Sequence, residues 1–183
     1  MVLDNTSIHR VDVGVPGALA YDACVQFETV FGEQYPANPS GPLLTILWGG
    51  VNDIQFSGQS AAQIAANLQC MVTRAKAHGS QVILATEISS LGSGDRGKDA
   101  LDPILRANAF AWGVDNLADL ATNPTLGADG ASANTQCFPD GLHPNTTCEP
   151  FVTAILQNAV NELTGSTQAC LLYTLTLPTN REV

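Results

Sequence analysis

The chain has 183 residues and carries 7 Lys and Arg against 17 Asp and Glu, a net charge of −10. This acidic balance disfavours nucleic acid and anionic membrane surfaces as partners, because both would repel the chain. Hydrophobic residues make up 45% of the sequence and charged residues 13%, which at this length is typical of one globular domain. We find neither an apolar run long enough to span a membrane nor an intact signal peptide in "MVLDNTSIHR".

The first half of the chain alternates between strand and helix patterns. The segment "RVDVGV" (10–15) predicts a short strand, the turn "GVPGA" follows it, and residues 19–31 are helical in pattern. The apolar run "LLTILWGG" (43–50) is bounded by glycines and predicts a buried parallel strand. Ser60 and Gln63 form a capping box that opens a helix ending near Gly79.

The second half continues the alternation. The pattern predicts a strand at 81–87, helices at 101–112 and 114–120, and a last helix at 151–163. Strands that alternate with helices predict an α/β fold, a three-layer α/β/α sandwich with a mainly parallel, flavodoxin-like sheet. In such sheets ligands bind beyond the carboxyl ends of the strands. We expect this domain to cover residues 1–165, with residues 166–183 as an extension.

The five cysteines lack the close pairing of a zinc site, so we expect no metal. A Cys137–Cys148 disulfide would close the loop that holds "FPDGLHPNTT", although two buried free thiols are the alternative. The triplets at Asn5 and Asn145 fit N-glycosylation acceptors. Low charge and a possible disulfide favour an extracytoplasmic or secreted protein, whereas the odd cysteine count weakens that prediction.

Three features lie where predicted strands give way to loops. Asp140 and His143 are three residues apart, so that the carboxylate could accept from Nδ1–H and leave Nε2 free as a base. Asn52 offers neutral N–H donors suited to a developing oxyanion, and Gly17 could bring a backbone N–H close to a ligand. Each feature alone has a plainer interpretation: a polar loop, an Asx-turn or a glycine turn. Together, in one chain order, they favour a site.

These residues resemble the SGNH hydrolases, the GDSL-type esterases and lipases. Gly50-Val51-Asn52-Asp53 is similar to the family's Gly-x-Asn-Asp block, and Asp140-Gly141-Leu142-His143 to its Asp-x-x-His block. The segment "VGVPGA" resembles the glycine block, with Gly17 at the oxyanion-hole position. The resemblance implies catalytic His143 and Asp140, an oxyanion hole of Gly17 and Asn52, a supporting turn with Gly50 and Asp53, and no cofactor.

The family's Gly-Asp-Ser nucleophile block is not visible in this sequence. Ser7 in "LDNTSIHR" has no Gly-Asp before it and lies only ten residues from Gly17, so we do not assign it as the nucleophile. The family's first, central strand is missing for the same reason. The strand-like segment "ACLLYTLTLP" (169–178), from this chain or from a second copy, could fill that position. A disordered tail or an added edge strand is the alternative.

The resemblance therefore implies a hydrolase of carboxylic esters whose nucleophile is unknown. The substrate would be a small-molecule, glycan or lipid ester, and strand completion by a second copy would favour a homodimer. A non-catalytic binding module and a truncated fragment of such an esterase are the alternatives.

Overall fold

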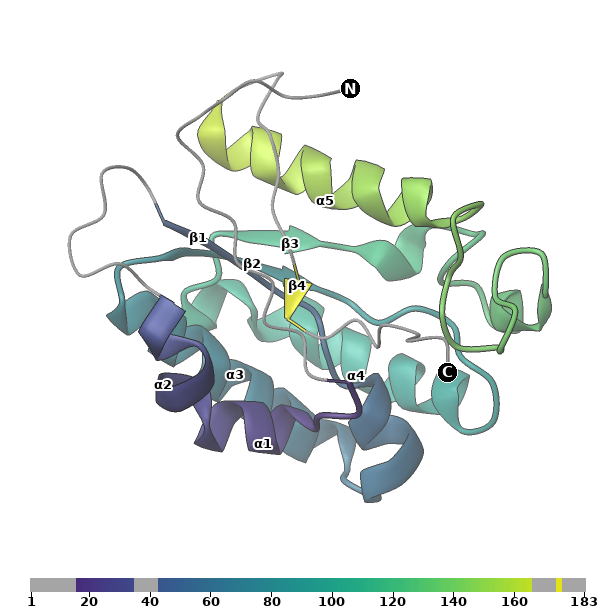
Figure 1. Cartoon of the computed structure of the whole chain (residues 1–183), viewed down its shortest axis with the longest axis horizontal. Coiled ribbons are helices and arrows are strands. Elements are labelled where there is room, and N and C mark those ends of the chain that lie inside the picture. Colours follow the sequence, from purple (N-terminus) through teal and green to yellow (C-terminus); the bar gives the residue numbers. More distant parts are fainter. Residues whose placement is uncertain (1–15, 35–42, 166–173, 176–183) are drawn as a thin grey trace.

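The computed structural model describes residues 16–34, 43–165 and 174–175, and its centre is a parallel sheet (Figure 1). The sheet has the order β3-β2-β1-β4, and every neighbouring pair is parallel. The strands are β1 (Leu44–Leu47), β2 (Gln81–Ala85), β3 (Asn116–Ala118) and β4 (Thr174–Leu175). The predicted α/β class with a mainly parallel sheet is confirmed.

Helices cover both faces of this sheet. One face carries α1 (Ala20–Val25), α2 (Phe27–Val30), α3 (Ala61–Ala77) and α4 (Gly94–Asn108), and the other carries α5 (Glu149–Thr164) (Figure 1). Shorter helical turns are η1 (Gly32–Gln34), η2 (Asp53–Ser57), η3 (Phe110–Trp112), η4 (Leu120–Thr122) and η5 (Ala131–Ala133). No helix in the described part of the chain is long and apolar enough to cross a membrane.

Alternation along β2 divides the core into two layers. Val82 and Leu84 are fully buried with α3 and α4, whereas Ile83 and Ala85 are buried with α5. Because successive strand residues point to opposite faces, a strand covered on both sides must be apolar at every position. The continuous apolar run in the sequence therefore corresponds to a fully covered strand.

The capping box of α3 is confirmed, because Ser60 and Gln63 each bond the other's backbone N–H. The expected helix at 19–31 is divided at Gln26 into α1 and α2. The helix expected at 101–112 begins earlier, at Gly94, and ends at Asn108. Its first turns are glycine-rich and charged, so they have no apolar periodicity that would reveal a helix.

The helix expected at 114–120 is wrong, because this segment contains strand β3. Its backbone pairs with β2, and the Asp115 carboxylate also accepts from Val82 N–H at 2.7 Å. A pattern of only seven residues does not distinguish a helix from a strand. Here the segment forms a strand because its backbone can pair with the free edge of β2.

A short strand from the tail lies beside β1. Thr174 pairs with Ile46 and Leu175 with Leu47, in parallel register. The strand expected at 10–15, which the same hypothesis places on the other side of this tail segment, lies outside the described residues.

Two disulfides close loops of very different length. Cys137 is joined to Cys148, 11 residues apart, and Cys24 of α1 is joined to Cys70 of α3, 46 residues apart. The second link was not predicted, because spacing alone does not give disulfide connectivity. It fastens the first helix of the described chain to the longest one.

Removing either disulfide should destabilise the fold, and the longer loop should matter more. In the chain-entropy model a Cys24→Ala/Cys70→Ala double variant loses about 4 kcal/mol of unfolding free energy, against about 3 kcal/mol for Cys137→Ala/Cys148→Ala. Urea unfolding of both double variants measures the difference. A larger loss at Cys137–Cys148 would contradict the expected order.

Candidate active site

The turn after β1 is fastened to the start of α1 by two hydrogen bonds. Asn52 Nδ2 donates to the Ala18 carbonyl at 3.0 Å, and the Ala20 N–H donates to Asp53 Oδ2 at 2.8 Å. The Asn52 side chain therefore bonds to a residue far away in the same sequence instead of forming a local Asx-turn. The amide nitrogen carries a second N–H, which remains able to bind a ligand.

Asp53 is fully buried beneath this turn. Burial raises the pKa of Asp53, while the N–H groups that it accepts from at the start of α1 oppose that shift. Gln59 also donates to Asp53 Oδ1, at 3.1 Å. The Asp53 carboxyl group therefore connects the turn after β1 to the start of α1 and to Gln59.

Gly17 stands at the exposed end of the same contact. Its φ is +76°, a left-handed conformation that favours glycine, and a Cβ there would meet nothing within 4 Å. Gly17 itself lines a hollow of about 220 Å³, together with residues that include Val30 and Phe31. Neither Asn52 nor His143 lines this hollow, so we do not place the reaction there.

Asp140 and His143 form a bonded pair on one turn. Asp140 Oδ2 bonds to His143 Nδ1, and Oδ1 accepts from the N–H groups of Leu142 (2.9 Å) and His143 (2.8 Å). Desolvation pushes the pKa of Asp140 upward, but the hydrogen bonds from His143 and Leu142 outweigh it and leave that pKa lowered. Asp140 is therefore an ionised carboxylate, and it accepts a hydrogen bond from the Nδ1–H of His143.

The other ring nitrogen of His143, Nε2, is available to accept a proton. This atom is shielded from solvent and has no hydrogen-bond partner among the described residues. With the proton held on Nδ1, Nε2 presents a lone pair. A buried acceptor without a partner is costly, so a ligand or nucleophile that donates a hydrogen bond to Nε2 would stabilise the site.

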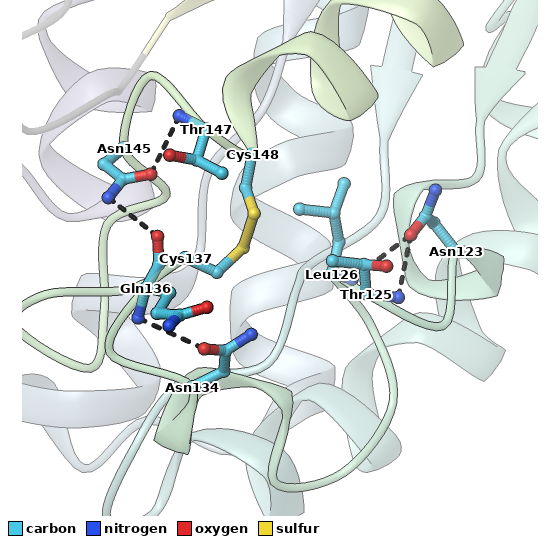
Figure 2. Close-up of a disulfide and its surroundings, with 9 residues drawn as sticks. All are labelled: Asn123, Thr125, Leu126, Asn134, Gln136, Cys137, Asn145, Thr147 and Cys148. Carbon is cyan, nitrogen blue, oxygen red and sulfur yellow. Dashed lines mark hydrogen bonds between the residues drawn. A yellow bond between two sulfur atoms is a disulfide. The ribbon is translucent and has the colours of Figure 1, made fainter.

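The loop that carries the pair is closed at its base (Figure 2). The Cys137–Cys148 disulfide joins its two ends, and the Asn145 N–H donates to the Cys137 carbonyl at 2.9 Å. Asn145 Nδ2 also donates to the Gln136 carbonyl at 3.0 Å. Asn145, one of the two residues whose triplets fit N-glycosylation acceptors, therefore uses its Nδ2 to hold the base of this loop. Asn5 lies outside the described residues.

A chain of contacts links this loop to the turn after β1. Gln55, on η2, donates from Nε2 to the Leu91 carbonyl at 2.6 Å, and the Leu91 N–H donates to the Gly141 carbonyl at 2.9 Å. Gly141 has φ +73°, and a Cβ there would overlap the Leu91 side chain. Gln55 and Leu91 were not predicted, because nothing in their local sequence marks such a contact.

No serine hydroxyl of the described residues bonds to His143. Each is bonded to other groups, such as the Asp53 carbonyl for Ser57 and Ser132 for Ser89. The remaining described serines with other hydroxyl partners are Ser60, Ser80, Ser90 and Ser93. Ser7 lies outside the described residues, and the nucleophile stays unassigned.

Two buried carboxyl groups lie behind the site and were missed in the sequence. Glu87 follows β2, and its N–H donates to Asp102 Oδ1 on α4 at 2.9 Å. Burial, reinforced by the charges of Asp102 and Asp53, raises the pKa of Glu87 to about 8, and burial raises that of Asp102 to about 6. Among the described residues no three His, Cys, Asp or Glu side chains form a metal site.

The geometry agrees with a known family of hydrolases. Residues 2–147 match the model of the GDSL-like lipase/acylhydrolase family. The chain belongs to this family. The predicted family is therefore confirmed, and its description as lipases and acylhydrolases supports the expected leaning towards a carboxylic ester hydrolase. No curated protein matches the chain by sequence.

Solved structures of similar fold support the architecture. A GDSL-like lipase from Bacteroides thetaiotaomicron has a TM-score of 0.63 and 21% identity, over 80% of this chain and 73% of that one. A putative acylhydrolase from Bacteroides fragilis has a TM-score of 0.60 and 24% identity, over 80% and 72%. An acetyl xylan esterase has a TM-score of 0.59 and 20% identity, over 80% and 78%.

The contact between Leu91 and Gly141 can be tested with matched glycine variants. Gly130 has a similar φ of +79° but open space around it, so Gly130→Ala should cost only about 1 kcal/mol. Gly141→Ala should cost more, because its Cβ also meets Leu91. Adding Leu91→Ala should recover the excess. Equal losses for the two glycine variants in urea unfolding would contradict the contact.

The buried Glu87 predicts a pH-dependent stability. Its pKa is raised from 4.5 to about 8 on folding, so the folded chain holds a proton that the unfolded chain has lost. Stability should therefore fall by about 1 kcal/mol per pH unit between these values and level off above them. Urea unfolding at pH 5, 6.5 and 8 should show this slope in the wild type and a shallower one in Glu87→Gln. Identical slopes would contradict the raised pKa.

Proposed function

We propose that the chain hydrolyses carboxylic esters, with His143 as general base, Asp140 as its orienting carboxylate, and the Gly17 N–H and Asn52 Nδ2 as oxyanion donors. The observation that carries this proposal is the state of His143. Its Nδ1 is bonded to a stable carboxylate, while its Nε2 is shielded and without a partner among the described residues.

The chemistry follows from that arrangement. Nε2 removes the proton of an attacking hydroxyl as its oxygen bonds to the ester carbonyl carbon, and the carbonyl oxygen becomes an oxyanion. Donors fixed in advance at this oxygen lower the barrier, because they need no reorganisation as charge develops. Nε2–H then returns the proton to the alkoxide leaving group as the C–O bond breaks.

Asn52 is suited to the oxyanion because it is neutral and fixed. Its bond to Ala18 and the neighbouring bond from Ala20 to Asp53 limit movement of the turn. Gly17 directly precedes Ala18, whose carbonyl is bonded to Asn52, so both proposed donors belong to segments that this bond joins. The attacking hydroxyl belongs either to water, which gives the acid directly, or to a residue outside the described ones. In the second case Nε2 deprotonates a water that attacks the acyl-enzyme, and the residue's oxygen takes that proton as the acid is released.

Acetyl esters are the substrates to test first. One solved structure of the same fold is an acetyl xylan esterase, and a small acyl group makes the least demand on a pocket. We also propose an oxidising compartment, because two disulfides persist where thiols are not kept reduced.

Hydrolysis of p-nitrophenyl acetate by wild type and His143→Ala tests the function. We expect the rate of His143→Ala to fall at least about a hundredfold, since general-base catalysis contributes about 10²–10⁴-fold. Gln136→Ala is a suitable control, because Gln136 directly precedes the disulfide-closed loop and has an exposed side chain, while the His143 ring is bonded to Asp140 instead. Equal rates in wild type and His143→Ala would contradict the proposal.

A binding module is the second candidate, and the absence of a His143-bonded serine among the described residues favours it. A fluorophosphonate separates the possibilities when it is followed by mass spectrometry. A His143-dependent adduct identifies a protein nucleophile. Hydrolysis without an adduct indicates activated water, and neither signal indicates a site that only binds.

A further inference from the structure

Three buried carboxyl groups lie close together next to the candidate site, those of Asp53, Glu87 and Asp102, and Glu87 is the one that closely follows strand β2. Glu87 lies in an unbroken buried stretch and is only 2% exposed. Its backbone N–H is bonded to Asp102 of α4. Burial of an ionisable group is costly unless the group makes bonds that the fold requires.

Glu87 contacts the turn after β1 directly. The Val51 N–H and the Trp48 side chain donate hydrogen bonds to its carboxyl group. Its Oε1 has no hydrogen-bond partner within the described part of the chain. That oxygen lies 3.1 Å from where a Cβ of Gly50 would be.

Gly50 shows how closely the turn is packed onto this carboxyl. Its φ is +133°, in the region that favours glycine, and a Cβ would also come within 3.1 Å of Leu101 and 3.2 Å of Ile64. The backbone therefore reaches Glu87 only because residue 50 has no side chain. Val51, bonded to Glu87, is followed immediately by Asn52.

We propose that Glu87 is a positioning residue that holds the Gly50–Val51–Asn52 turn and so fixes the amide of Asn52. Glu87 supports the turn from the sheet side, and Ala18 anchors the amide from the α1 side. This inference rests on the proposed function, because it assigns Glu87 to the oxyanion donor of the same site. Glu87 itself touches no substrate.

The protonation of Glu87 should control how well the turn is held. The charged groups that face it are Asp102 on α4 and Asp53 on η2, and both are negative. Lys98 and Arg106 act on Asp102 rather than on Glu87. With burial, these charges raise the pKa of Glu87 to about 8, so the neutral acid supports the turn at pH 7. Above pH 8 the carboxylate accepts more strongly from Val51 and Trp48 but repels Asp102 and Asp53, so ionisation changes how the turn is held.

Backbone and side-chain ¹⁵N resonances give a test that needs no substrate. In His143→Ala, used to remove any titration of that ring, the Val51 N–H and the Asn52 side-chain amide should shift together with a midpoint near pH 8. The shift should vanish in His143→Ala/Glu87→Gln. Resonances that stay still between pH 6 and 10, or that move equally without Glu87, would overturn the proposal.

Asp102→Asn provides a second variant in case Glu87→Gln does not fold. It keeps an oxygen to accept from the Glu87 N–H but removes a charge that raises the pKa of Glu87. The midpoint should therefore move to lower pH. A midpoint that does not move, or that moves upward, would count against Glu87 as the titrating group.

The same transition should appear in hydrolysis. Because ionisation of Glu87 changes its bond to Val51, the ratio of the wild-type rate at pH 9 to that at pH 7 should differ severalfold from the ratio for Glu87→Gln. Equal ratios would overturn the link to the oxyanion donor. If the wild type does not hydrolyse esters but the resonances titrate as expected, the proposed function fails and the support of the turn by Glu87 stands.

Discussion

The carboxylate of Asp140 is the group on which the candidate site depends most. One oxygen accepts two backbone N–H groups and shapes the turn, while the other bonds to the His143 ring. The same side chain therefore builds the loop and orients the base that the loop presents. It can do so because the loop is closed by a disulfide and because Gly141 leaves room for Leu91.

The oxyanion side of the site is built from a different part of the chain. The turn after β1 is fixed by the start of α1 on one side and by Glu87 on the other. Gln55 and Leu91 then connect this turn to the loop of Asp140. The proposed base and the proposed oxyanion donors thus lie on separate elements that a few short hydrogen bonds connect.

The sequence was informative where physical patterns are local. Apolar runs predicted β1 and β2, a capping box predicted the start of α3, and the Asp140–His143 spacing predicted a bonded pair. It was uninformative where the cause lies elsewhere in the chain. Strand β3 forms because β2 offers an edge, and the buried role of Glu87 depends on Gly50, which is 37 residues away in the printed sequence.

The central claim is that Asp140 holds the His143 proton on Nδ1 and leaves Nε2 as an acceptor. Long-range ¹H–¹⁵N correlation of the histidine ring measures this directly, because the two nitrogens have different shifts with and without a proton. The account predicts that neutral His143 carries its proton on Nδ1. A neutral ring protonated on Nε2 would contradict it, because no lone pair would then be available to take a proton from an attacking hydroxyl.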